Sequence, residues 1–151
     1  MGGNNIHAEG VNAIAQALKD NAIITTLELG YNPIGPDGAK ALSEILKFHG
    51  NVKTLKLGWC QITAKGAEYV ADMLRYNNTI SVLDLGANGI RDEVTSDRFY
   101  QSVFTLKANE DVTVTSINLG NNFLTKFGQS ALTDARDHVL EMTEKEVEIF
   151  F

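Results

Sequence analysis

The chain has 151 residues, of which 44% are hydrophobic and 21% charged, and its formal net charge is −6. This size and balance indicate one ordinary globular domain, and no apolar run approaches the roughly 18 residues that span a bilayer. The negative charge disfavours nucleic acid and an anionic membrane surface as partners, and it suits a protein partner of basic or mixed charge.

The first complete unit of the chain is predicted to begin with a short strand. Ile24, Leu27 and Leu29 are expected to face inward, while Thr26 and Glu28 face outward, which is the alternation of a strand with one buried face. The residues that follow, Gly30-Tyr31-Asn32-Pro33, are typical of a turn. The Asn32 side chain is expected to satisfy backbone groups inside that turn.

A helix is predicted after this turn. Pro36 suits its first turn, and the apolar residues of its inner face recur three and four positions apart at Ala39, Leu42, Ile45 and Leu46. Strand, turn, helix and return loop together make one right-handed β–α unit.

The unit then repeats along the chain. Similar segments start at Ile24, Val52 and Ile80, and their strand leucines, Leu27, Leu55 and Leu83, recur with a constant period of 28. A fourth segment starts at Val114, and the step from Leu83 to Ile117 is longer than this period, so six extra residues are expected between 91 and 113. A fixed period of this length is the mark of a solenoid, and residues 1–151 are predicted to form one repeat domain.

Both ends of the array are predicted to be incomplete repeats. Met1 occupies the position of Leu29, and the segment Val147–Phe151 is expected to be a last, partial strand. Terminal repeats normally carry a polar cap, and neither end shows one. Two interpretations follow: the chain is a fragment of a longer array, or its uncapped ends associate with another copy.

The pattern LxxLxLxxNxI, followed by Gly-Ala and helical leucines, resembles the leucine-rich repeat family over nearly the whole chain, and specifically its ribonuclease-inhibitor-like subclass. The resemblance implies an α/β fold, a right-handed β–α superhelix with parallel strands on the concave face and helices on the convex face. The subclass includes ribonuclease inhibitors, Ran GTPase-activating proteins, tropomodulin-type actin cappers and the repeats of NOD-like receptors.

The sequence offers no catalytic or metal-binding pattern. The three histidines lie in different repeats without zinc-ligand spacing, and no phosphate-binding or nucleophile motif is present. The single cysteine, Cys60, excludes an intramolecular disulfide and fits a cytoplasmic location, since the N-terminus is unlike a signal peptide. The glycosylation-like triplet Asn77-Asn78-Thr79 is interpreted as chance. We therefore predict a protein that is not an enzyme and uses no cofactor and no metal.

The outward strand positions are the more informative ones. Equivalent residues of parallel strands form ladders, and the position between the strand leucines carries Glu28, Lys56, Asp84 and Asn118. Tyr31 and Trp59 are expected to be neighbours at the edge of this face. The charges are expected to pair across strands, and two interpretations stay open: a self-satisfied solvated face, or a surface that selects a partner. The aromatic rings likewise either stack on one another or contact a partner.

The resulting prediction is a non-catalytic protein-interaction module that binds a protein partner on its concave strand face. The predicted partner-binding residues are Glu28, Tyr31, Lys56, Trp59, Asp84 and Asn118. One alternative is a structural spacer within a larger leucine-rich repeat receptor or scaffold. Another, implied by the resemblance, is a small-GTPase regulator of the Ran GTPase-activating type.

Overall fold

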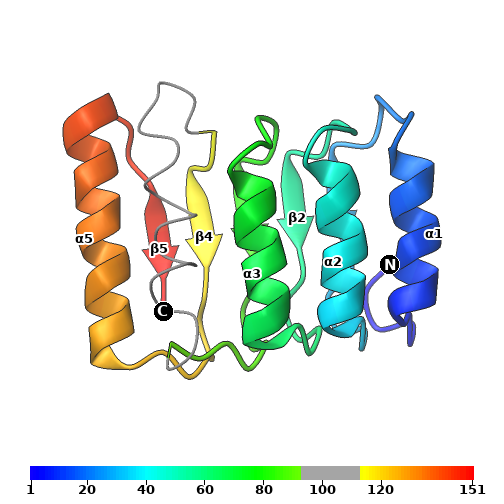
Figure 1. Ribbon diagram of the computed structural model, residues 1–151, viewed down its shortest axis with the longest axis horizontal. Helices are drawn as coiled ribbons and strands as arrows, with labels where there is room; N and C mark the ends of the chain where they lie inside the picture. The colour runs from blue at the N-terminus through cyan, green and yellow to red at the C-terminus, as the bar shows by residue number, and fades with distance from the viewer. Residues whose placement is uncertain (93–112) are drawn as a thin grey trace.

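The computed structural model describes residues 1–92 and 113–151, which form a stack of strand–helix units. Figure 1 shows the helices side by side in one layer and the strands in a second layer behind them. This is the α/β solenoid that the repeats predict. In chain order the elements are α1 (Ala8–Leu18), β1 (Thr26–Glu28), α2 (Gly35–Leu46), β2 (Thr54–Lys56), α3 (Thr63–Leu74), β3 (Val82–Asp84), β4 (Ser116–Asn118), α5 (Lys126–Thr143) and β5 (Glu148–Phe150).

The described strands form one parallel sheet in chain order, and its register follows the repeat. Leu27 pairs with Leu55 and Leu55 with Leu83, so each pairing joins residues exactly one repeat period apart. Leu83 pairs with Ile117, which places the longer step between β3 and β4. The range expected to hold the six extra residues, between 91 and 113, lies almost wholly outside the described residues. The last strand expected within Val147–Phe151 is confirmed, because β5 pairs in parallel with β4, and it is as long as the other described strands.

The core lies between the two layers. The inward strand leucines are at most 3% exposed, and α2 buries Ala39, Leu42 and Leu46 against them. Ile45 is only partly buried at the edge of this stripe. Since each helix and strand has one apolar side, stacking of the units is what removes these side chains from water.

The expectation that Ile24 lies inside is wrong. Its side chain is 40% exposed, whereas the equivalent Val52 and Ile80 are fully buried. The repeat before Ile24 contributes a helix but no strand, so one side of this position stays open to water. Burial at a repeat position therefore depends on the neighbouring repeat as well as on the pattern.

Asparagines in the turns join consecutive repeats by buried hydrogen bonds. The Asn88 amide oxygen accepts from the N–H of Cys60 (2.9 Å) and of Ile62 (3.2 Å) in the preceding repeat, and its amide nitrogen donates to the Leu57 carbonyl (2.7 Å). Asn32 makes the same kind of bonds, which confirms the role expected for it. These bonds are needed because the turns are buried and their backbone groups cannot reach water.

Cys60 occupies the equivalent position in the second of these turns. Its thiol is fully buried and donates to the carbonyl of Leu29, with Sγ and O 3.3 Å apart. Cys60 thus replaces the hydrogen bond that an asparagine amide nitrogen donates in the other turns. It replaces the bonds to the asparagine oxygen poorly, because a thiol is only a weak acceptor. Burial raises the pKa of the Cys60 thiol, which favours its neutral form.

Asp92 joins the third repeat to the N-terminus of α5. Its Oδ2 accepts from the Thr125 hydroxyl (2.5 Å), the Thr125 N–H (3.1 Å) and the Gly128 N–H (3.0 Å). Burial by itself raises the pKa of Asp92, but these hydrogen bonds outweigh it and the pKa lies below its usual value. A carboxylate at a helix N-terminus is also favoured by the helix dipole.

Candidate functional site

The outer surface of the sheet, on the side away from the helices, is called the strand face here. The last residue of each of the first four strands points onto it, because the middle residue of each strand is buried. The register places these last residues side by side, in the order Glu28, Lys56, Asp84, Asn118. The predicted polar ladder is therefore present.

The ladder contains one ion pair. Lys56 Nζ lies 2.5 Å from Glu28 Oε1, and about half of each side chain is exposed. Hydrogen bonding to Lys56 lowers the pKa of Glu28, and the same contact raises the pKa of Lys56. Both groups are thus charged over the physiological range.

The alternation of charge does not continue into a second ion pair. Asp84 Oδ1 accepts from Asn118 Nδ2 (2.9 Å) and from the Gly86 N–H (2.9 Å). Among the described residues, the ion pair of Lys56 is with Glu28 and none joins it to Asp84. One carboxylate is therefore held by neutral donors, and the ladder as a whole has a small negative excess.

Tyr31 and Trp59 lie at the edge of the strand face. Their rings are stacked, with centroids 5.9 Å apart and an interplanar angle of 10°. Stacking between the two rings is confirmed, yet Tyr31 remains 68% exposed and Trp59 56% exposed. The stacked pair therefore presents a large, rigid aromatic surface to solvent.

A repeated backbone conformation sets the direction of these two rings. Tyr31 (φ 61°) and Trp59 (φ 59°) are both left-handed, as are Ala87 and Asn121 at the equivalent positions of later repeats. For residues other than glycine this conformation costs on the order of 1–2 kcal/mol. The glycine before Tyr31 allows a close approach of the backbone, since a Cβ on Gly30 would lie 3.2 Å from the Gly58 carbonyl oxygen.

All six predicted partner-binding residues line one hollow of about 330 Å³ on the strand face. The hollow extends across β1 to β4, and its lining also includes glycines of the turns and Asn121. Its lining combines an ion pair, a carboxylate, an amide and two stacked rings. Such a surface can form hydrogen bonds, ionic contacts and aromatic contacts with the same ligand.

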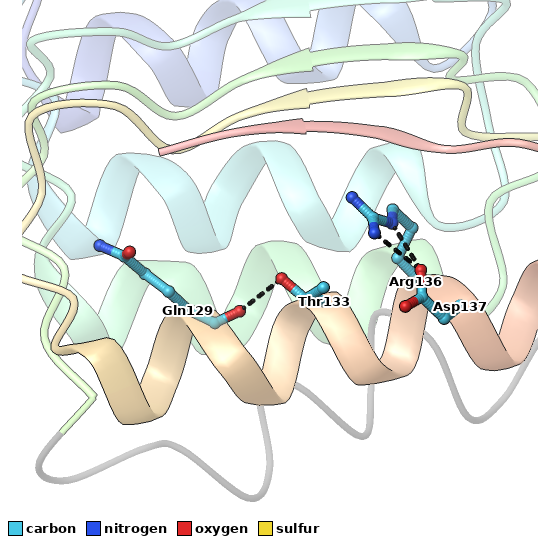
Figure 2. A network of polar contacts seen from close by, with 4 residues as sticks. All are labelled: Gln129, Thr133, Arg136 and Asp137. Carbon is cyan, nitrogen blue, oxygen red and sulfur yellow. Dashed lines mark hydrogen bonds and ion pairs between the residues drawn. The ribbon is translucent and has the colours of Figure 1, made fainter.

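A second hollow, of about 390 Å³, lies where α5 meets β5. The charged groups on this part of α5 contact one another: Figure 2 shows the Arg136 guanidinium donating to the Asp137 carboxylate, 2.7 Å away. The figure also shows the Thr133 hydroxyl donating to the Gln129 carbonyl within the same helix. None of the predicted partner-binding residues is here, and association through the ends of the array stays a prediction.

The described residues contain neither a possible metal site nor a helix that could span a membrane. Within 1–92 and 113–151, no three His, Cys, Asp or Glu side chains gather into a possible metal site. No helix in the same ranges is long and apolar enough to cross a membrane. Asn77, the acceptor of the glycosylation-like triplet, is 3% exposed and donates to the Leu46 carbonyl, so the folded chain does not offer it to an enzyme.

A second exposed aromatic pair was missed by the sequence reasoning. Phe48 and Tyr76 follow α2 and α3, and their ring centroids are 5.5 Å apart. They lie one repeat period apart in the sequence, so the period was the signal that could have found them.

Three stretches, residues 20–43, 51–71 and 76–93, match the family model described as "Leucine Rich repeat". These three stretches of the chain are similar to leucine-rich repeats. Among solved structures, the chain is similar to one titled "Leiomodin-1 Actin-Binding Site 2 (ABS2)", with a TM-score of 0.68 and 18% sequence identity. The match covers 93% of the present chain and 78% of the other. At this identity the likeness shows a shared fold. No curated protein sequence matches the chain.

Proposed function

We propose that the chain is a non-catalytic protein-interaction module that binds a protein partner on its strand face. The observation that carries this proposal is the shared hollow, in which a stacked and exposed Tyr31–Trp59 pair lies beside the Glu28–Lys56 ion pair. Trp and Tyr are enriched among the residues that dominate binding energy. Here their rings are already ordered, so a partner would lose little entropy in fixing them.

The polar ladder would supply selectivity. An exposed ion pair contributes little to stability, so Glu28 and Lys56 can exchange it for contacts with a partner at small cost. Asp84 is held in place by Asn118 and adds a negative charge beside the rings. A partner segment of basic or mixed charge, which brings a cation toward Asp84 and a flat or apolar group toward Trp59, fits this arrangement.

The test is a pull-down from lysate of the source cells that compares the wild type with a Lys56→Glu, Trp59→Ala double variant. A Lys126→Glu, Phe127→Ala variant is the matched control, because it makes the same two kinds of change at exposed positions on α5. We expect a protein that the wild type and the control retain and the double variant loses. If all three forms retain the same set of proteins, the strand face is not the binding surface.

Actin is the first named partner to test. The similar solved structure is titled as an actin-binding site, and the present chain shares its fold over 93% of its length. Co-sedimentation with actin filaments and binding to actin monomers are the direct assays, with the strand-face double variant as the comparison. Co-sedimentation that the double variant retains in full would assign actin to another surface.

The finer family placement and the alternative functions remain proposals as well. The constant repeat period and the helices of 11 and 12 residues in the first three units support the ribonuclease-inhibitor-like subclass. If the pull-down retains nothing, the structural spacer becomes the leading interpretation. Stimulated GTP hydrolysis by a small GTPase would instead support the regulator of the Ran GTPase-activating type.

A further inference from the structure

The loops that lead from α1 to β1, from α2 to β2 and from α3 to β3 are called the helix-to-strand rim here; the loop from α5 to β5, which carries Glu144 and Glu146, is not part of it. The rim consists of residues 19–25, 47–53 and 75–81, at the top of the view in Figure 1. The rim is basic, although the whole chain has 13 basic and 19 acidic residues. Its only acidic residue is Asp20, and its basic residues are Lys19, Lys47, Lys53 and Arg75.

Two exposed aromatic residues occupy the same repeat position on this rim. Phe48 is 70% exposed and Tyr76 50% exposed. Lys47 Nζ lies 5.1 Å from the centroid of the Tyr76 ring, and the Arg75 guanidinium carbon lies 5.8 Å from it. The aromatic pair is therefore bordered by cations.

The cations exceed the carboxylates near them. Lys47 and Arg75 both contact Asp72, which is the acidic residue that the structure pairs with either of them. Two positive charges thus share one negative charge, and Lys53 adds a third cation on the same rim. The local excess is positive, opposite in sign to the charge of the whole chain.

The rim contains a notch, and a buried or partly buried asparagine side chain holds two of its loops in place by hydrogen bonds to the backbone. A notch of about 180 Å³ lies between the loops, and Phe48, His49 and Tyr76 are part of its lining. Asn77 is buried beneath it, where it donates to the Leu46 carbonyl (2.7 Å) and accepts from the Ile80 N–H (2.8 Å). Because the loop conformation is fixed in this way, binding there would require little further ordering.

Asn21 performs the same role two units earlier, at the equivalent repeat position. Its side-chain oxygen accepts from the N–H of Ile23 (2.9 Å) and of Ile24 (2.8 Å). Ile23 is 86% exposed, so the first loop of the rim also carries an exposed apolar side chain. Asparagine side chains therefore hold the first and third loops of the rim, and each of the three loops carries an exposed apolar or aromatic side chain.

We propose that the helix-to-strand rim is a second docking surface, which binds an acidic segment of a partner protein. Carboxylates of the segment contact Lys47, Lys53 and Arg75, and an apolar side chain of the segment packs on Phe48 and Tyr76. Charge complementarity favours this occupant. An anionic bilayer is disfavoured, because the chain as a whole carries a charge of −6 and because a flat membrane does not fill a notch. This surface is separate from the strand face and does not depend on the function proposed for it.

The proposal is tested with a fluorescein-labelled peptide of repeating Glu-Glu-Phe units, whose binding is measured by fluorescence anisotropy. A peptide of repeating Lys-Lys-Phe units is the comparison. We expect the acidic peptide to bind and Phe48→Ser and Lys53→Glu each to weaken it about tenfold, the loss typical of a binding hot spot. Phe127→Ser, which removes an aromatic residue that is 81% exposed on α5, should leave binding unchanged. Circular dichroism checks that every variant is folded.

Three outcomes would overturn the proposal. The first is equal affinity of the wild type for the acidic and the basic peptide. The second is binding of the acidic peptide that neither Phe48→Ser nor Lys53→Glu changes. The third is capture by vesicles that contain phosphatidylserine, lost in these two variants, with no binding of the acidic peptide; this result would assign the rim to a membrane. The strand-face double variant Lys56→Glu, Trp59→Ala should still bind the acidic peptide, so the two surfaces fail independently.

Discussion

Replacing Asn88 by alanine should be among the most destabilising single changes in the chain. The side chain is 2% exposed and makes four hydrogen bonds to backbone groups: it accepts from Cys60 and Ile62 and donates to Leu57 and Gly86. Each such bond contributes about 1 kcal/mol net, so we expect the free energy of unfolding to fall by about 4 kcal/mol. This loss is a large fraction of the roughly 5–15 kcal/mol that stabilises a typical domain.

Asn118→Ala is the matched control, measured alongside it by urea denaturation. Asn118 also bonds a neighbouring group, Asp84, but it lies on the partly exposed strand face, where water can replace the lost contact. We expect a loss below about 1 kcal/mol for this variant. Similar losses for the two variants would refute the reasoning, since they would mean that burial of the turn does not determine the value of its hydrogen bonds.

Cys60→Asn should raise the free energy of unfolding in urea by about 1 kcal/mol, because an amide oxygen is a strong acceptor where the thiol is only a weak one; a loss would show that the buried site has no room for the amide. Ala87→Gly should raise the thermal midpoint by relieving about 1 kcal/mol of strain at φ 52°; a lowered midpoint would contradict this. The carboxylate of Asp92 should stabilise the fold fully above its usual pKa of 3.8, and this contribution should disappear as the pH falls through its lower folded-state pKa. Calorimetry should therefore show the wild type losing stability faster than Asp92→Asn between about pH 5 and pH 2; parallel curves would argue against the assignment.

The positions of the strands could be predicted from the sequence because a parallel register repeats the period. Leu55 pairs with Leu27 on one side and with Leu83 on the other, so a constant spacing in the sequence becomes contact in the sheet. The ladder of Glu28 and Lys56 follows from the same geometry. These features depend only on which residues occupy the same position in successive repeats, and the repeat period shows this in a single sequence.

Features that depend on local backbone geometry or on the neighbouring repeat were not predictable in this way. The left-handed conformation of Tyr31 and Trp59 is rare for aromatic residues, and no residue preference indicates it. Ile24 follows the strand pattern but lacks a complete repeat beside it. Phe48 and Tyr76 lie in loops after helices, where the amphipathic pattern ends and gives no information on exposure.

Because Cys60 is buried, the reactivity of its thiol can be used to measure how the repeats separate from one another. It is the only thiol in the sequence, it is fully buried, and it lies in the turn between the second strand and α3. In native buffer a thiol reagent can reach it only after that part of the stack separates, so the labelling rate measures the free energy of local opening. In a chain whose repeats contact only their neighbours, this value shows whether the units separate one by one or cooperatively.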